Sequence, residues 1–317
     1  MQLRDLSSTG LRISPVALGC WPLAGMTGLG VNEADSLATL HAAYDRGINF
    51  FDTAYCYGFD GLSERLIAQA FRGRREKIVI ATKCGIHWKS PTVRVTDSRP
   101  EVLRREFEES LRRLKTDHVE LLYLHAYDGR TPIAKIAATM AAFVEERKAK
   151  SIGVSNLTLA QLKEFRAICP LGAVQLLYNM VQRDVERDIL PWCRNQGISC
   201  VAYWSLMNGL LTGRLPRDHR FQPGDDRATY GMLQGEVWHR NHDLVDDLRR
   251  IGADLGMTVA QLVVNWTIHQ PGITSALCGA RRPEQIEETA GGANLELPPE
   301  TLARIEKVIV NRHAALA

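Results

Sequence analysis

Short runs of apolar and β-branched residues alternate with longer amphipathic stretches along most of the chain, and this alternation limits the possible folds most. Eight runs have the length of buried strands: residues 16–19, 49–52, 78–82, 120–125, 151–154, 173–177, 199–203 and 274–278. Helical patterns lie between or after them, at residues 33–46, 100–114, 132–148, 158–166, 185–196 and 283–290. Such repetition is typical of parallel βα units.

Eight βα units in 317 residues favour an α/β fold of the closed (β/α)₈ TIM-barrel type over an open doubly wound sheet. A dinucleotide-binding open sheet needs G-x-G-x-x-G between its first strand and helix. The glycines of residues 25–30 have a different spacing and do not open directly into a helix. The sequence contains no internal repeat or low-complexity tract, so we expect residues 1–317 to form a single domain.

Two segments stand outside the eightfold pattern. Residues 2–13, with Gly10 at a turn, predict a short N-terminal β-hairpin that caps the bottom of the barrel. Residues 215–240 are rich in Arg, Asp, Pro and Gly and too long for an ordinary connection, which indicates an active-site loop or lid. We also expect extra helices in the C-terminal part, including residues 243–255 and 258–269.

Charge and composition exclude several classes of function. The net charge of +3 comes from 39 basic and 36 acidic residues spread along the chain, so we expect no nucleic-acid partner. No apolar run approaches the ~20 residues of a membrane span, and residues 1–19 lack the pattern of a signal peptide, which predicts a cytoplasmic protein without a membrane partner. The seven scattered cysteines include no C-x-x-C pair, which favours reduced thiols and no metal. Nothing in the sequence defines an oligomeric state.

Ionisable side chains follow three consecutive predicted strands. Asp52 ends the second strand, with Tyr57 in the loop behind it, Lys83 ends the third and His125 ends the fourth. The active site of a (β/α)₈ barrel lies at the C-terminal ends of its strands, and neighbouring strands bring their loops to one patch. Each residue alone is more often structural, but their joint placement points to one catalytic site.

These four residue types can together donate a proton to a carbonyl oxygen. A free phenol is a poor acid at neutral pH, with a pKa near ~10. We expect Lys83 to lower the pKa of Tyr57 and Asp52 to keep Lys83 charged and oriented. His125 can direct the substrate carbonyl and hydrogen-bond its oxygen.

At these residues the sequence resembles the aldo-keto reductase superfamily. The stretch Phe51-Asp52-Thr53-Ala54-Tyr55-Cys56-Tyr57-Gly58 followed by Ser63-Glu64, Ala81-Thr82-Lys83, and Leu122-Tyr123-Leu124-His125 with Asp128 are similar to the family's motifs. The similarity continues through Ile152-Gly153-Val154-Ser155-Asn156, Gln175 with Tyr178-Asn179, Ala202-Tyr203 with Gly209 to Gly213, and Gly279-Ala280-Arg281 with Gln285 and Glu288. It extends from residue 19 to residue 289.

The resemblance implies a barrel that binds NADPH, with NADH as an alternative, and transfers hydride to the carbonyl carbon of a small aldehyde or ketone. It makes Tyr57 the general acid, Lys83 and Asp52 the residues that adjust the pKa of Tyr57, and His125 the residue that orients the substrate. Ser155, Asn156 and Gln175 would hold the nicotinamide carboxamide. The implied cofactor-binding residues are Gly19, Trp21, Asp52, Ser155, Asn156, Gln175, Tyr203, Trp204, Ser205, Leu206, Asn208, Gly209, Leu211, Gly213, Gly279, Ala280, Arg281, Gln285, Glu288 and Thr289.

The sequence departs from the family pattern after the seventh strand, where Tyr203-Trp204-Ser205-Leu206 replaces the common Y-S-P-L. Spacing favours Tyr203 for stacking on the nicotinamide, with adjacent Trp204 as the alternative. Backbone amides of residues 206–213 could hold the pyrophosphate. Thr289 stands where the family often has asparagine.

The resemblance also implies a cofactor preference and a substrate pocket. Arg281 and Arg282 favour NADPH through its 2′-phosphate. We expect Cys20, Trp21, Trp88, Tyr127 and the 215–240 loop to line the substrate pocket, and Cys84 to be a buried, inert thiol rather than a reactive one.

Three alternative functions remain open at this stage. The same site could act oxidatively, as an NAD(P)-dependent sugar dehydrogenase. The chain could be a cofactor-binding regulatory subunit resembling potassium-channel β subunits, although the intact set of four residues argues against it. A metal-dependent hydrolase barrel is disfavoured because no H-x-H ends the first strand. The natural substrate is not defined by the sequence.

Overall fold

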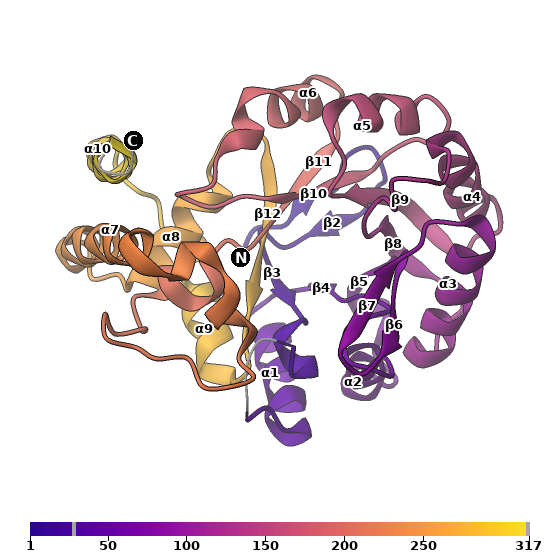
Figure 1. The fold of residues 1–317 in the computed structure, drawn as a ribbon, viewed down its shortest axis with the longest axis horizontal. Helices are drawn as coiled ribbons and strands as arrows, with labels where there is room; N and C mark the ends of the chain where they lie inside the picture. The colour runs from indigo at the N-terminus through magenta and orange to yellow at the C-terminus, as the bar shows by residue number, and fades with distance from the viewer. Residues whose placement is uncertain (27–29, 315–317) are drawn as a thin grey trace.

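The computed structural model describes residues 1–26 and 30–314. In this part of the chain, eight parallel strands form a closed barrel in which neighbours follow chain order (Figure 1). They are β3 (Val16–Gly19), β4 (Phe50–Asp52), β5 (Val79–Cys84), β8 (Val119–Leu124), β9 (Ala149–Ser155), β10 (Ala173–Leu177), β11 (Ser199–Tyr203) and β12 (Ile273–Gly279), and β12 pairs with β3 to close the ring. The predicted (β/α)₈ barrel is therefore confirmed.

Helices surround the barrel, and one or more follow each strand: α1 (Glu33–Asp45), α2 (Leu62–Ala70), α3 (Pro100–Leu114), α4 (Ile133–Glu145), α5 (Leu159–Arg166), α6 (Ile189–Asn195), α8 (Val259–Ile268) and α9 (Pro283–Gly291). Local sequence explains their starts. Thr158 and Thr258 each form a capping box with a glutamine three residues later, which satisfies free N–H groups at the first turns of α5 and α8.

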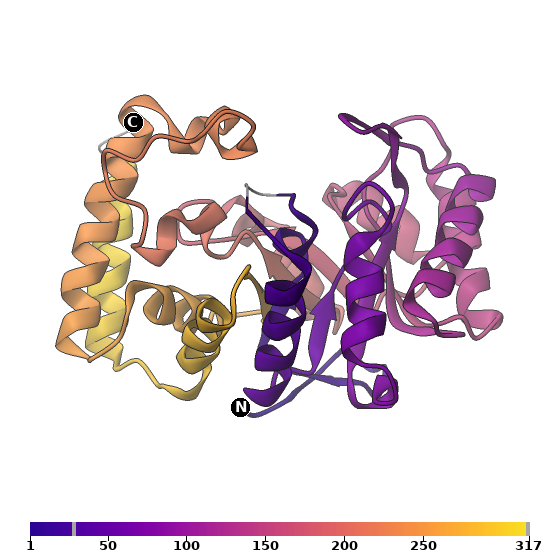
Figure 2. The same cartoon turned by 90° about the horizontal axis from the view of Figure 1, so that it is seen from below.

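Two further helices, α7 (Gly235–Asp254) and α10 (Pro299–Ala314), lie side by side on the outside of the barrel (Figures 1 and 2). Of the two helices expected after residue 240, the one over residues 243–255 corresponds to α7 and the one over residues 258–269 corresponds to α8, whereas the residues of α10 were not predicted as a helix. However, α7 begins at Gly235 rather than at residue 243, so the predicted loop over 215–240 ends earlier. Trp238 explains the earlier start, because it is buried and donates its indole N–H to the Arg217 carbonyl at 2.8 Å.

The N-terminal hairpin seals one end of the barrel. Strands β1 (Arg4–Asp5) and β2 (Arg12–Ile13) pair in antiparallel fashion, as predicted. Leu6 and Ile13 pack with side chains that point into the barrel, among them Phe50, Leu121 and Tyr123. The second, larger apolar core lies between the strands and the helices. This hairpin therefore covers the end of the barrel opposite the carboxyl ends of the strands.

A second hairpin, which the sequence did not predict, rises from those carboxyl ends. Strands β6 (Ile86–Ser90) and β7 (Val93–Thr96) pair between β5 and α3. Figure 2 shows this hairpin and the segment before α7 on the same end of the barrel, opposite the end that carries the N-terminus. None of the described helices is both long and apolar enough to span a membrane. The glycine-containing segment 25–30 includes residues 27–29, which lie outside the described residues.

Candidate active site

Asp52 and Lys83 meet inside the barrel because their strands are neighbours. Asp52 pairs with Ala81 in the β4–β5 register, and Lys83, two residues further, points to the same side as Ala81. Its Nζ lies 2.5 Å from Asp52 Oδ1 and donates to the Thr53 carbonyl at 2.7 Å. The same Nζ lies 3.2 Å from the Tyr57 Oη. The structure thus brings together two residues that the sequence placed at neighbouring strand ends, Asp52 and Lys83, and the loop residue Tyr57.

Tyr57 stands in the loop after β4 with its ring between two aromatic side chains. The Trp21 ring packs edge-on at 5.0 Å between centroids, and the His125 ring lies at 5.9 Å. Burial, followed by the nearby Asp52 carboxylate, raises the pKa of Tyr57 well above its ordinary value. The net pKa is thus raised rather than lowered, because burial and the Asp52 charge outweigh the lowering expected from Lys83. The phenol remains protonated.

His125 follows β8 and is fixed on both sides. Its backbone N–H donates to the Cys84 carbonyl at 2.9 Å, and its own carbonyl accepts from Asn156 Nδ2 at 3.0 Å. Its Nδ1 lies 3.7 Å from the Cys56 Sγ. Burial, followed by the charges of Lys83 and Arg94, lowers the His125 pKa well below its ordinary value, so the imidazole is neutral.

Polar side chains of β9 to β11 form a hydrogen-bonded chain beside this group. Gln175 donates from Nε2 to Asp52 Oδ2 at 2.7 Å, and its backbone carbonyl accepts from Ser155 Oγ at 3.2 Å. The Tyr203 hydroxyl donates to Asn156 Oδ1 at 2.7 Å. The residues expected to face a nicotinamide are thus connected to Asp52, and their orientations are fixed.

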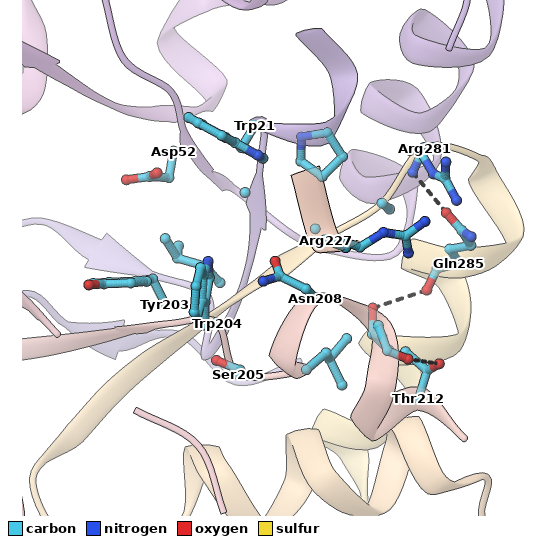
Figure 3. Close-up of a pocket in the computed structure, with 18 of the residues that line it drawn as sticks. Trp21, Asp52, Tyr203, Trp204, Ser205, Asn208, Thr212, Arg227, Arg281 and Gln285 are labelled. Carbon is cyan, nitrogen blue, oxygen red and sulfur yellow. Dashed lines mark hydrogen bonds between the residues drawn. The ribbon is translucent and has the colours of Figure 1, made fainter. Parts of the chain in front are cut away.

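These side chains line one end of a cavity of about 470 Å³, within the size range of small-molecule and cofactor sites. Figure 3 shows Asp52, Tyr203 and Trp204 toward one end, and Arg227, Arg281 and Gln285 toward the other. The predicted residues that line it are Gly19, Trp21, Asp52, Tyr57, His125, Ser155, Asn156, Gln175, Tyr203, Trp204, Ser205, Leu206, Asn208, Gly209, Gly279, Ala280, Arg281, Gln285, Glu288 and Thr289.

Arg227 and Arg281 line the other end of this cavity. Arg281 donates its backbone N–H to Gln285 Oε1 at 2.8 Å, which fixes the turn into α9. The Arg227 guanidinium pairs with both carboxylate oxygens of Asp225, the shortest contact being 2.6 Å. These groups make this end of the cavity suited to a phosphate-bearing ligand.

The chain after β11 has an unusual backbone where it forms the cavity wall. Trp204 and Asn208 have φ of 58° and 51°, and Gly209 has φ of 97°. A positive φ is uncommon for a bulky residue such as tryptophan. Strain of this kind gathers at ligand sites, where the surrounding structure maintains it. The Trp204 ring packs against Tyr230 of the long loop at 5.1 Å.

Some predicted residues do not line the cavity. Leu211 is fully buried, and Gly213 ends the short helix of residues 207–212 against Val259. Lys83 lies behind the wall and reaches the site through Tyr57. Four others stand away from the lining or behind it, namely Cys20, Trp88, Tyr127 and Arg282.

Cys84 is a fully buried thiol. Burial raises the pKa of Cys84 well above its ordinary value, in agreement with an inert thiol. Within residues 1–26 and 30–314, histidine, cysteine and carboxylate side chains form no group of three or more that could hold a metal ion.

Sequence reasoning missed several lining residues, above all Arg94, which belongs to the unpredicted hairpin. It also missed Thr212 and Arg214, which lie just before the predicted loop. Arg227 and Tyr230 belong to that loop, which was expected to line the site only as a whole. Thr212 lies within the stretch Gly209 to Gly213 that resembles the family, but no local motif marks the other positions, which long-range packing brings to the cavity.

Comparisons with known proteins agree on one family. A family model described as the Aldo/keto reductase family matches residues 15–310. The aldo-keto reductase YhdN of Bacillus subtilis is 33% identical, over 98% of this chain and 94% of its own. An NADH-specific methylglyoxal reductase of Escherichia coli is 32% identical, over 94% of this chain and 95% of its own. The structure of a glycerol dehydrogenase from Gluconobacter oxydans superposes with a TM-score of 0.89 at 31% identity, covering 98% of this chain and 95% of that one.

Proposed function

Since this chain belongs to the aldo/keto reductase family, we propose that this oxidoreductase reduces aldehydes or ketones to alcohols with NADPH, and that Tyr57 is its general acid. One observation carries the proposal: Lys83 Nζ contacts both Asp52 Oδ1 and Tyr57 Oη beside a ligand-sized cavity. The Lys83 ammonium is already paired with Asp52, so the ion pair does not require the phenol of Tyr57 for charge balance.

Tyr57 gives its Oη proton to the carbonyl oxygen of the substrate. The raised pKa of Tyr57 keeps the proton in place until charge develops on that oxygen. The phenolate left behind lies beside Lys83 Nζ, which stabilises it at 3.2 Å. A positioned general acid of this kind contributes roughly 10²–10⁴ in rate.

Neutral His125 orients the same carbonyl. Burial raises the pKa of the Cys56 thiol to about 12, so its S–H is intact and can donate to His125 Nδ1. That contact favours the tautomer with the proton on Nε2, which then donates to the carbonyl oxygen. Two donors, Tyr57 Oη and His125 Nε2, therefore converge on one oxygen.

The cavity residues fit a nicotinamide dinucleotide. Ser155, Asn156 and Gln175 offer complementary donors and acceptors to the carboxamide. Tyr203 presents its ring beside them, held by its hydroxyl bond to Asn156, whereas Trp204 packs on Tyr230. This contrast supports Tyr203 as the stacking ring. When bound, the nicotinamide supplies hydride to the carbonyl carbon.

The other end of the cavity fits the phosphates. The positive-φ backbone from Met207 to Gly209 can direct amide N–H groups toward an anion. Ser205 lines the wall, but its hydroxyl donates to the Ala202 carbonyl at 3.3 Å. Arg281 would supply positive charge to the additional phosphate of NADPH, whereas the Arg227 charge is already balanced by Asp225. The Arg281 guanidinium therefore supports NADPH over NADH.

Turnover of neutral aromatic aldehydes with NADPH and with NADH tests the proposal. We expect the wild type to reduce 4-nitrobenzaldehyde, and Tyr57→Phe to lose about 10²–10⁴ in kcat. Tyr55→Phe is the matched control, because its hydroxyl bonds to Glu109 outside the cavity. A wild type without carbonyl turnover, or a Tyr57→Phe variant as active as Tyr55→Phe, would contradict the proposal.

The oxidative direction is the second candidate, since a similar solved structure is titled a glycerol dehydrogenase. Steady-state rates with glycerol and NAD(P)⁺, set against those with an aldehyde and NADPH, distinguish the two directions.

A further inference from the structure

Arg94, on β7, is an exposed arginine that lines the cavity near Tyr57 and His125. Its side chain makes no ion pair or hydrogen bond with the described residues. Two other arginines of the lining are neutralised, because Arg214 pairs with Glu288 and Arg227 pairs with Asp225. The Arg94 charge is therefore available to a ligand.

Two indole rings hold this guanidinium in place. Its central carbon lies 4.8 Å from the centroid of Trp21 and 5.4 Å from that of Trp88. The Trp88 indole N–H donates to the Cys56 carbonyl at 2.9 Å, which fixes that ring to the loop before Tyr57. Cation–π contacts of this kind orient an arginine without neutralising it.

The cation stands close to the reacting groups. Trp21 separates it from Tyr57, since one indole contacts both the guanidinium and the phenol ring. The Arg94 charge also contributes to the lowered pKa of His125. A substrate whose carbonyl oxygen reaches Tyr57 could therefore place a second polar group, a few bonds away, against Arg94.

The carboxylate beside Tyr57 would repel an anion at this position little, because its charge is balanced. Asp52 is the carboxylate beside Tyr57, and Lys83 and Gln175 engage its two oxygens. Because both contacts are made with aromatic rings rather than with acceptor groups, the guanidinium N–H groups remain for a ligand, and they match carboxylate and phosphate oxygens. Phe59 extends the aromatic wall beside Trp88, with ring centroids 6.3 Å apart.

We propose that Arg94 selects carbonyl substrates that carry an anionic group, a carboxylate or a phosphate, near the reacting carbonyl. The inference rests on the proposed reductase function and names the substrate class of the same site. It makes Arg94 a specificity-determining residue that binds substrate and takes no part in proton transfer.

The test compares 4-formylbenzoate with 4-formylbenzamide, which share a shape and differ in charge. We expect the wild type to favour the benzoate in kcat/KM, and Arg94→Gln to reduce this preference about tenfold to a hundredfold through the benzoate alone. Arg94→Lys should recover part of the preference, because it keeps the charge but not the planar fork. Glyceraldehyde 3-phosphate against glyceraldehyde tests the phosphate in the same way.

Lys89→Gln is the matched control, since it removes one positive charge from the same hairpin at a side chain outside the cavity lining. An equal loss of preference in this variant would overturn the assignment to Arg94. So would equal effects of Arg94→Gln on both aldehydes, or a higher KM for NADPH with the preference intact. Absence of turnover with every aldehyde would instead contradict the proposed function.

Equilibrium binding gives a readout independent of turnover. Titration with 4-(hydroxymethyl)benzoate, followed by tryptophan fluorescence, should show tighter binding to the wild type than to Arg94→Gln. The neutral 4-(hydroxymethyl)benzamide should bind both equally. Equal binding of the benzoate to both proteins would contradict the inference even if no carbonyl were reduced.

Discussion

Asp52 and Lys83 form a buried ion pair across β4 and β5, with 2.5 Å between Oδ1 and Nζ and no more than 1% of either side chain exposed. Burial raises the pKa of Asp52, whereas the Lys83 charge acts in the opposite direction. Each charge therefore depends on the other. Gln175 and the Thr53 carbonyl satisfy further hydrogen bonds of the pair.

Removing one member of this pair should destabilise the fold. We expect Lys83→Met to lower the free energy of unfolding by about 3–5 kcal/mol, because it leaves Asp52 buried without its partner. Adding Asp52→Asn should recover much of that loss. Urea denaturation of the wild type, the single variant and the double variant measures both effects, and a fully stable single variant would show that water reaches Asp52.

His125 should remain neutral through the neutral pH range. Its pKa lies well below 6.5, so kcat/KM should show no inflection near that value. The unfolded state takes up the proton first as pH falls below about 6.5, and stability should decline there. His125→Gln should show a smaller decline over the same interval. An activity limb near pH 6.5 that disappears in His125→Gln would contradict a neutral imidazole.

Arg281 should contribute to cofactor preference. We expect Arg281→Met to weaken NADPH binding about tenfold to a hundredfold, with little change for NADH, because only NADPH carries the additional phosphate. Arg282→Met removes the same charge one residue later, outside the cavity lining. Fluorescence titration with both cofactors measures the effect, and equal losses for NADPH and NADH would argue against a phosphate contact.

Gly153 leaves space for a buried ring. A Cβ at this position of β9 would overlap Cε1 and Cδ1 of Tyr123 on the neighbouring strand. Gly153→Ala should therefore cost about 1–3 kcal/mol or more through overpacking. Gly231→Ala provides the control, since its Cβ would meet nothing within 4 Å. Thermal unfolding compares the two, and similar melting temperatures would show that Tyr123 can move.

The barrel could be predicted because each of its strands is buried on both faces. Parallel strands of this kind appear as short apolar runs, and all eight runs correspond to strands. Because the active site of this fold lies at the strand ends, the predicted ends were sufficient to single out Asp52, Lys83 and His125 without any knowledge of contacts. The β6–β7 hairpin was not predicted because none of its strand residues is buried, and some, such as Val93, are exposed, so they show no such pattern.

Electrostatic balance and long-range contacts could not be predicted in the same way. The direction of the Tyr57 pKa depends on how deeply the ring is buried and how close the Asp52 carboxylate lies, and neither is visible along the chain. Arg94 is held at the cavity by Trp21, which is far from it in sequence, and by Trp88, which lies on the paired strand β6. Both depend on the assembled barrel.

The N-terminus lies at the end of the barrel that the first hairpin seals, away from the mouth of the cavity (Figure 2). An affinity tag or a surface tether attached at Met1 should therefore leave diffusion of small molecules into the protein unobstructed. The turn between β6 and β7 is the opposite case, because any bulky graft there would stand over the entrance.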